Sequence, residues 1–119
     1  MASSYSIVHK DQVLDLNLRV ARGFFARSWG WLSRTQIGPQ DALWIEPCAR
    51  VHCFFMRVPI AVVMLDLEGF VVDFRDPVRP WELGPRGAAG GVALELAPGA
   101  VSRLGIGLGD RLTLKASSR

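Results

Sequence analysis

Residues 62–74 read Val62-Val63-Met64-Leu65-Asp66-Leu67-Glu68-Gly69-Phe70-Val71-Val72-Asp73-Phe74. Two runs rich in β-branched and aromatic residues flank the short connection 67–69, and a glycine in such a connection is typical of a hairpin turn. The segment therefore predicts an antiparallel β-hairpin. It also sets the expectation of a mostly β protein.

Further strands are expected on both sides of this hairpin. The residues from Leu14 to Val20 alternate apolar with polar side chains, which is the period of a half-buried strand. Short apolar runs elsewhere are bounded by proline, glycine or charged residues, as strands usually are. The five segments predicted as strands are 14–20, 42–46, 51–56, 92–96 and 111–115.

Two short helices and one long loop complete the predicted secondary structure. From Ala21 to Leu32 the apolar residues recur with a helical period. Residues 98–104 fit one or two helical turns that begin at a proline and end at Gly105. Residues 75–91 contain three prolines and four glycines, and this composition predicts a loop without regular structure.

The length and composition favour one folded domain. The chain has 119 residues, of which 50% are apolar and 21% are charged, so it is long enough to bury a single core and is not of the disordered class. We expect one domain over residues 1–119. Its core spans about residues 12–115, and residues 1–11 are expected to form a loose N-terminal tail.

No membrane span or export signal is expected. The longest apolar run, residues 58–65, is far shorter than the roughly 20 residues that a transmembrane helix needs. The N-terminal residues show no basic start followed by an apolar stretch, so we expect a cytoplasmic location. Cys48 and Cys53 are predicted to be free thiols, because five residues along a strand separate them widely and turn them to opposite faces.

The charge distribution argues against a nucleic-acid partner. The net charge is +3, and the excess of basic residues lies within residues 1–39. Arg19, Arg22, Arg27 and Arg34 lie beside aromatic residues there, which would suit a nucleic acid. The same spacing is that of an ordinary amphipathic helix packed on a sheet, so nucleic-acid binding is the weaker interpretation.

Cys48, His52 and Met56 are the only soft-donor group with a regular spacing. Thiolate, imidazole and thioether are ligands that copper(I) prefers. On a strand, however, the first and last of them lie about 13 Å apart, which is too far for one ion. We therefore predict no metal and no cofactor.

Glu95 is the one acidic residue within an apolar strand segment. Because Leu94 and Leu96 flank it, its side chain is expected to point away from the face that the leucines bury, either to solvent or to an arginine. The sequence shows no second carboxylate that would converge with it for hydrolysis. An enzyme of unknown reaction that uses Cys48, His52 and Glu95 is the alternative function.

Several short motifs follow one another in a specific order. They are Trp31-Leu32-Ser33-Arg34, Pro47-Cys48, Val51-His52-Cys53-Phe54-Phe55-Met56-Arg57-Val58-Pro59-Ile60, the hairpin 66–72, Arg79-Pro80-Trp81, Leu94-Glu95-Leu96 with Pro98-Gly99, and Gly105-Ile106 with Gly109-Asp110. In this order they resemble domain-of-unknown-function family 192 of bacteria and archaea, over roughly residues 12–115. The resemblance implies a compact β-barrel-like fold with one or two short flanking helices, in the mostly β (α+β) class, and no established reaction.

The chain departs from the family pattern at Ala61. Members typically carry an aspartate there, so any role of that carboxylate is absent or displaced. Nearby Arg57 needs a partner if it is partly buried. We expect that partner to be an acid, Glu95 or Asp66, or else a bound anion.

The leading function hypothesis is a non-catalytic module that binds a ligand or a protein partner. In this interpretation the segment 75–91, with Arg79 and Trp81, lines a surface for a small anionic or polymeric ligand together with Arg57. His52 and Glu95 complete the set of candidate binding residues. No catalytic residue is assigned.

Overall fold

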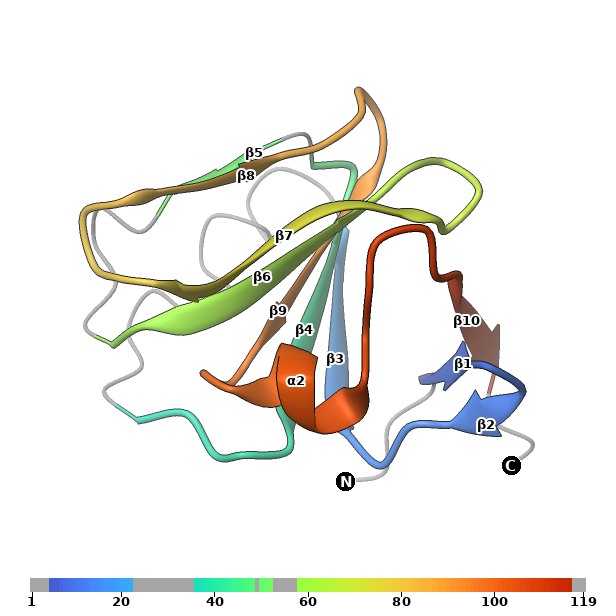
Figure 1. Ribbon diagram of the computed structural model, residues 1–119. Helices are drawn as coiled ribbons and strands as arrows, with labels where there is room; N and C mark the ends of the chain where they lie inside the picture. Colours follow the sequence, from blue (N-terminus) through green and yellow to red (C-terminus); the bar gives the residue numbers. More distant parts are fainter. Residues whose placement is uncertain (1–4, 23–35, 49, 53–57, 117–119) are drawn as a thin grey trace.

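A five-stranded sheet lies at the centre of the computed structural model, which describes residues 5–22, 36–48, 50–52 and 58–116 (Figure 1). Its strands, in spatial order, are β3 (Asn17–Arg22), β4 (Asp41–Glu46), β9 (Val92–Leu96), β6 (Ile60–Leu65) and β7 (Val71–Val78). β3 and β4 are parallel, and the other neighbours are antiparallel.

The predicted hairpin is confirmed as β6 and β7. The Oδ1 atom of Asp66 accepts hydrogen bonds from the backbone N–H groups of Glu68 and Phe70, both at 2.9 Å. Gly69 has a φ of 93°, and a Cβ atom there would come within 2.5 Å of the backbone oxygen of Leu112. The turn therefore needs glycine both for its backbone conformation and for the close approach of a second chain segment.

Two smaller sheets flank the central one in the described part of the chain. The first is ordered β10 (Leu112–Ala116), β1 (Tyr5–His9), β2 (Gln12–Val13), and the second pairs β5 (Arg50–His52) with β8 (Leu83–Arg86). A short helix, α2 (Ala100–Leu104), ends at Gly105 as predicted, but it begins two residues after the predicted start at Pro98. The fold is thus mostly β with one short described helix. The sheets do not close into a barrel, so the barrel-like expectation is not confirmed.

The prediction of a loose tail over residues 1–11 is wrong for the residues described. β1 pairs with β10 along its whole length, from Tyr5 opposite Ala116 to His9 opposite Leu112. Ile7 is buried in the core, and His9 is buried too. The partner strand is about a hundred residues away in the sequence, so the local composition of residues 5–9 gives no sign of the pairing.

The prediction of an irregular loop over residues 75–91 is also wrong. β7 continues to Val78, and β8 follows after a four-residue turn. Pro77 is tolerated because β7 is an edge strand of the central sheet, where a missing N–H group removes no bond from an interior ladder. Composition alone overestimated the disruptive effect of these prolines.

The other predicted strands are found with shifted ends. Segments 42–46, 92–96 and 111–115 are confirmed to within one residue as β4, β9 and β10. Of segment 14–20 only residues 17–20 are in a strand, β3, and residues 51 and 52 belong to β5. Residues 53–56 and most of the predicted helix 21–32 lie outside the described residues, although Ala21 and Arg22 end β3 rather than begin a helix.

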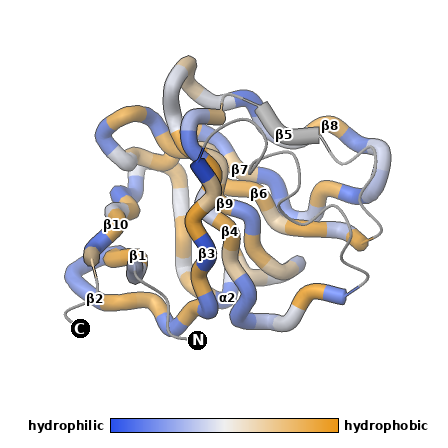
Figure 2. The backbone as a smooth tube through the Cα atoms, turned by 180° about the vertical axis from the view of Figure 1, so that it is seen from behind, coloured by the Kyte–Doolittle hydropathy of each residue, from blue (hydrophilic) through white to orange (hydrophobic). Residues whose placement is uncertain are grey.

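The central strands β4, β6 and β9 are buried on both faces, so the sheet separates two clusters of apolar side chains. Figure 2 colours the backbone by hydropathy and shows the hydrophobic course of β6 in orange. The first-face cluster includes Leu94, Leu96, Ala61 and Val63, with Ile7, Ala100, Val101 and Leu112 from outside the sheet. The second-face cluster is formed by Ala21, Leu43, Ile45, Ile60, Val62, Met64, Val78 and Ala93. Within the described ranges, no helix has the length and apolar character to cross a membrane.

Candidate functional site

Glu95 lies in the middle of the central sheet and is buried. Its side chain is on the second face, because Leu94 and Leu96 on either side belong to the first-face cluster. Leu43 of β4 and Val62 of β6 occupy the register positions next to it. Only 7% of Glu95 is exposed, so the expectation that it faces solvent is wrong. The leucines bury one face, but the other face is buried as well.

The Glu95 carboxyl has no hydrogen-bond or ion-pair partner within the described parts of the chain. Burial raises its pKa from the ordinary 4.5 to about 7, because an unpaired carboxylate is poorly solvated among apolar groups. No described side-chain nitrogen or oxygen is both fully buried and unpaired.

Strand pairing places one residue from each of the five strands of the central sheet in a row that contains Glu95, and an arginine lies at each end of this row. Arg19 of β3 is opposite Leu43, and Arg75 of β7 is opposite Val62. Each is two strands from Glu95, about 10 Å across the sheet. Both are exposed, and neither forms an ion pair with Glu95. The expectation that Glu95 points to an arginine is therefore not met within the described residues.

The turn between β7 and β8 places Trp81 on the surface. The backbone N–H of Arg79 donates to Oε1 of Glu82 at 2.7 Å, and the N–H of Glu82 donates to the carbonyl of Arg79 at 3.0 Å. Arg75 holds the same carboxylate at 3.4 Å and the Leu83 carbonyl at 3.1 Å. Trp81 has a φ of 71° and is 65% exposed. The turn thus fixes a large aromatic ring in a strained, outward position.

One further candidate residue, His52, lies in β5. The backbone of His52 is opposite Leu83, so His52 is close along the ribbon to the turn that carries Trp81. Arg50 holds the register position opposite Arg86. Arg57, Cys53 and Met56 lie outside the described residues, and so the predictions of an Arg57 partner, of free thiols and of no metal remain predictions.

Glu95 and position 61 lie on opposite faces of the central sheet. Ala61 is fully buried in the first-face cluster, whereas Glu95 faces the second cluster. A carboxylate at position 61 would therefore lie on the opposite side of the sheet. Asp66, the other acid expected there, uses Oδ1 to hold the hairpin turn.

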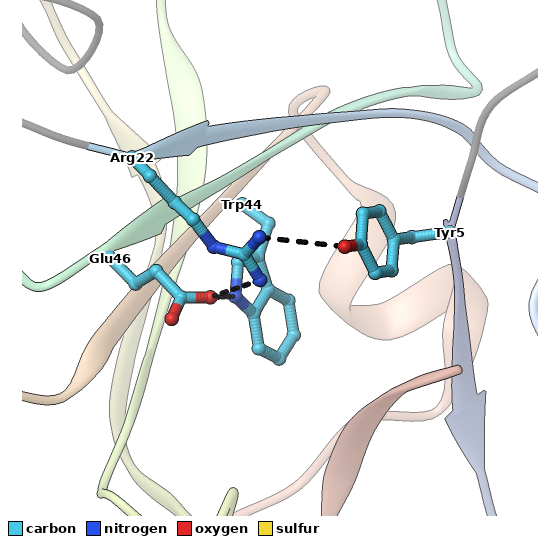
Figure 3. Close-up of polar contacts among 4 residues, drawn as sticks. All are labelled: Tyr5, Arg22, Trp44 and Glu46. Atoms are coloured by element: carbon cyan, nitrogen blue, oxygen red, sulfur yellow. Dashed lines mark hydrogen bonds and ion pairs between the residues drawn. The ribbon is translucent and has the colours of Figure 1, made fainter. Parts of the chain in front are cut away.

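A cluster that the sequence analysis did not predict joins β1 to β3 and β4 (Figure 3). Arg22 contacts the Tyr5 hydroxyl and Oε1 of Glu46, both at 3.5 Å, and Trp44 Nε1 donates to the same oxygen at 2.7 Å. The Tyr5 hydrogen bond and then the charge of Glu46 raise the pKa of Arg22. These contacts link three strands, so the cluster serves to hold them together. The pairing of residues 22 and 46 depends on strand register, which no local pattern reveals.

His9 and Asp110 form a second unpredicted contact. His9 Nε2 lies 2.8 Å from Oδ2 of Asp110, and the N–H of Gly107 donates to the same oxygen at 3.0 Å. The His9 hydrogen bond and then the Gly107 bond lower the pKa of Asp110. This contact attaches β1 to the turn that leads into β10.

Residues 6–114 match the family model of domain-of-unknown-function family 192, described as uncharacterized ACR. The chain belongs to this family. The resemblance inferred from the order of the sequence motifs is confirmed, and no biochemical activity comes with the family description. No curated protein is significantly similar to the chain.

Two solved structures share the fold of this family 192 protein. A protein of unknown function from Novosphingobium aromaticivorans superimposes with a TM-score of 0.74 at 18% identity, covering 92% of this chain and 82% of that one. A Sinorhizobium meliloti protein, named as a candidate transcription regulator, gives a TM-score of 0.73 at 19% identity and covers 95% of both chains. At these identities the similarity establishes the fold alone.

Proposed function

We propose that this protein is a non-catalytic binding module that holds an acidic protein segment on the β8 surface. We define the β8 surface as the exposed side chains of Arg79, Trp81, Leu83 and Arg86 on β8 and the turn before it. The observation that carries the proposal is the exposed ring of Trp81 on a turn locked by Glu82. A rigid aromatic side chain supplies contact area at little cost in conformational entropy.

The charges of the β8 surface favour an anionic partner. Both nearby acids are engaged within the protein, since Glu82 holds the turn and Asp76 accepts the N–H groups of Gly99 and Val101. Arg79 and Arg86 are exposed and have no acidic partner among the described residues. The surface therefore presents uncompensated positive charge beside apolar side chains.

The extent of the β8 surface favours a linear partner over a small ion. Leu83 and Arg86 lie about 10 Å apart along the strand, and Trp81 and Arg79 extend the surface beyond the end of β8. One small anion cannot reach both arginines. An extended segment with two separated acids and an apolar residue between them can span this distance.

The test is the binding of a short fluorescein-labelled peptide that alternates glutamate with leucine and alanine, followed by fluorescence anisotropy. Trp81→Gly and Arg79→Gln should each weaken binding about tenfold, because each removes one anchor of the contact. Trp81→Gly also relieves the positive φ, so the fold should stay intact. Leu108→Ala and Arg19→Gln, which alter exposed residues elsewhere, are the matched controls and should leave the affinity unchanged.

Two results would overturn the proposal. One is equal binding of a peptide in which glutamine replaces every glutamate, because the charge argument would then fail. The other is displacement of the acidic peptide by an oligothymidine that binds more tightly through the same residues, which would assign the surface to nucleic acid.

A further inference from the structure

Exposed apolar side chains gather at the end of the molecule that is formed by the turn between β6 and β7. The large ones are Leu67, Phe70, Val72 and Leu108. Leu108 comes from a second turn, residues 107–110, which is hydrogen-bonded to the N–H and the C=O of Val71 at 2.8 and 2.9 Å. The two turns therefore lie side by side, and their apolar side chains belong to one surface.

The same surface carries acidic charge. Asp66 and Glu68 flank Leu67 in the turn, and the exposed Glu68 side chain forms no ion pair within the described residues. Arg111 is engaged in its own chain, since its guanidinium carbon lies 5.5 Å from the centroid of the Phe70 ring and its Nε donates to the Glu68 carbonyl at 2.8 Å. We define the hairpin surface as the exposed side chains of Leu67, Glu68, Phe70, Val72 and Leu108.

The hairpin surface complements the β8 surface. The β8 surface presents exposed arginines beside Trp81, whereas the hairpin surface presents an exposed acid beside aliphatic side chains and an aromatic ring. The sequence Asp66-Leu67-Glu68 places an apolar residue between two acids, which is the pattern proposed for the partner of the β8 surface. Opposite charges beside apolar groups favour the pairing of these two surfaces.

The hairpin turn and Trp81 do not meet within one chain. The hairpin turn precedes β7 and the turn that carries Trp81 follows it, and Figure 1 shows the two turns at opposite ends of this strand. β7 has 8 residues, so it is about 25 Å long. Contact between Leu67 and Trp81 therefore requires two molecules.

We infer that the acidic partner of the β8 surface is the hairpin surface of a second copy of this chain, an inference that rests on the proposed function. In this contact Leu67 of one copy packs on the Trp81 ring of the next, and Glu68 pairs with Arg79. The contact is head-to-tail, because it joins two different surfaces. Each pair of molecules thus keeps one free surface of each kind, to which further copies add.

The size of the contact predicts a weak association. The exposed parts of four apolar side chains amount to a few hundred Å², about half of the roughly 800 Å² that each partner buries in a stable interface. We therefore expect a dissociation constant on the order of 0.1 mM.

The experiment is sedimentation equilibrium of the full chain at protein concentrations from about 10 µM to about 1 mM. The average mass should rise with concentration, and about 0.5 M sodium chloride should reduce the rise, because salt screens exposed charge pairs. Arg19→Gln, an exposed change elsewhere, should associate as the wild type does. A wild type that stays monomeric over the whole range would overturn the inference.

Two complementary variants test the head-to-tail geometry. Trp81→Gly removes the aromatic anchor of the β8 surface, and Glu68→Arg reverses the charge of the hairpin surface. Each variant alone should associate at least about tenfold more weakly than the wild type. An equimolar mixture should form a 1:1 heterodimer with the wild-type affinity, because each variant keeps the surface that the other lacks. Undiminished association of Trp81→Gly alone, or a mixture that associates no more than its components, would overturn the inference.

Leu108→Ala separates this inference from the proposed function. It should weaken self-association severalfold, because it trims the hairpin surface, and leave the affinity for the acidic peptide unchanged, because the β8 surface stays intact. Unchanged self-association would overturn the assignment of the hairpin surface. If the wild type binds the acidic peptide but the mixed variants do not associate, only this inference fails. If the wild type does not bind the acidic peptide, the proposed function fails.

Discussion

The two faces of the central sheet differ in what covers them and in what they contain. The first face is closed by residues from β1, α2 and β10, and its described cluster is wholly apolar. The described cluster on the second face consists of residues of the central sheet and has Glu95 at its centre. The first face therefore provides stability through apolar burial, whereas the second face carries a group that lowers stability when it ionises.

The largest effect is expected from removing a buried apolar side chain on the first face. Leu94→Ala removes a fully buried side chain and should lower the free energy of unfolding by about 2 to 5 kcal/mol, measured by urea denaturation. Leu43→Ala, the same change on the second face beside Glu95, should cost less at pH 8, because the space it leaves lets water reach the carboxylate. Equal losses at the two positions would show that the faces do not differ in this way.

The next largest effect is a pH dependence of the free energy of unfolding that arises from Glu95 on the second face. The pKa of Glu95 is about 7 in the folded protein against an ordinary 4.5, so the folded state binds this proton more tightly than the unfolded state. The contribution of Glu95 protonation to the free energy of unfolding is complete below pH 4.5 and is lost as the pH rises through 7. The loss amounts to about 3 kcal/mol between pH 4 and pH 8.

Glu95→Met isolates this contribution from other titrating groups. The variant should lack that part of the pH dependence in urea denaturation, and it should be more stable than the wild type at pH 8. A wild-type minus variant difference that does not change from pH 4 to pH 8 would contradict the assigned pKa.

The smallest effect is expected at the edge of the first face. Asp110→Asn weakens the contact with His9 and should lower the melting temperature by a few degrees, measured by circular dichroism. Hydrogen exchange of the β1 amides should become faster, while that of the β6 amides should not change. Faster exchange in β6 as well would show that β1 is not separately attached through this contact.

The predictions from sequence succeeded where a local pattern carries the structural signal. The hairpin at residues 62–74 was predicted because β-branched runs and a glycine turn are neighbours in the chain. Gly105 correctly marked the end of α2. The family was correctly inferred because the order of several motifs is itself a property of the sequence.

The prediction of the site failed where a partner comes from elsewhere in the chain. Glu95 was expected to point to solvent or to an arginine, because alternation in a strand identifies one buried face and says nothing about what covers the other. Trp81 stays a candidate, and the structure adds how it is held on the surface. The turn that fixes it depends on Glu82 and Arg75, whose contacts arise only when β7 and β8 lie side by side.

Periodicity, turn residues and motif order were enough to predict a mostly β protein of family 192 with a hairpin at residues 62–74. Three features could not be predicted in this way: residues 5–9 form a strand with β10, Glu95 is buried on the second face, and Arg22 contacts Glu46 and Tyr5. The physical reason is strand pairing over long sequence distances. Burial and partners then depend on register and on which elements cover each face, and neither is encoded by neighbouring residues alone.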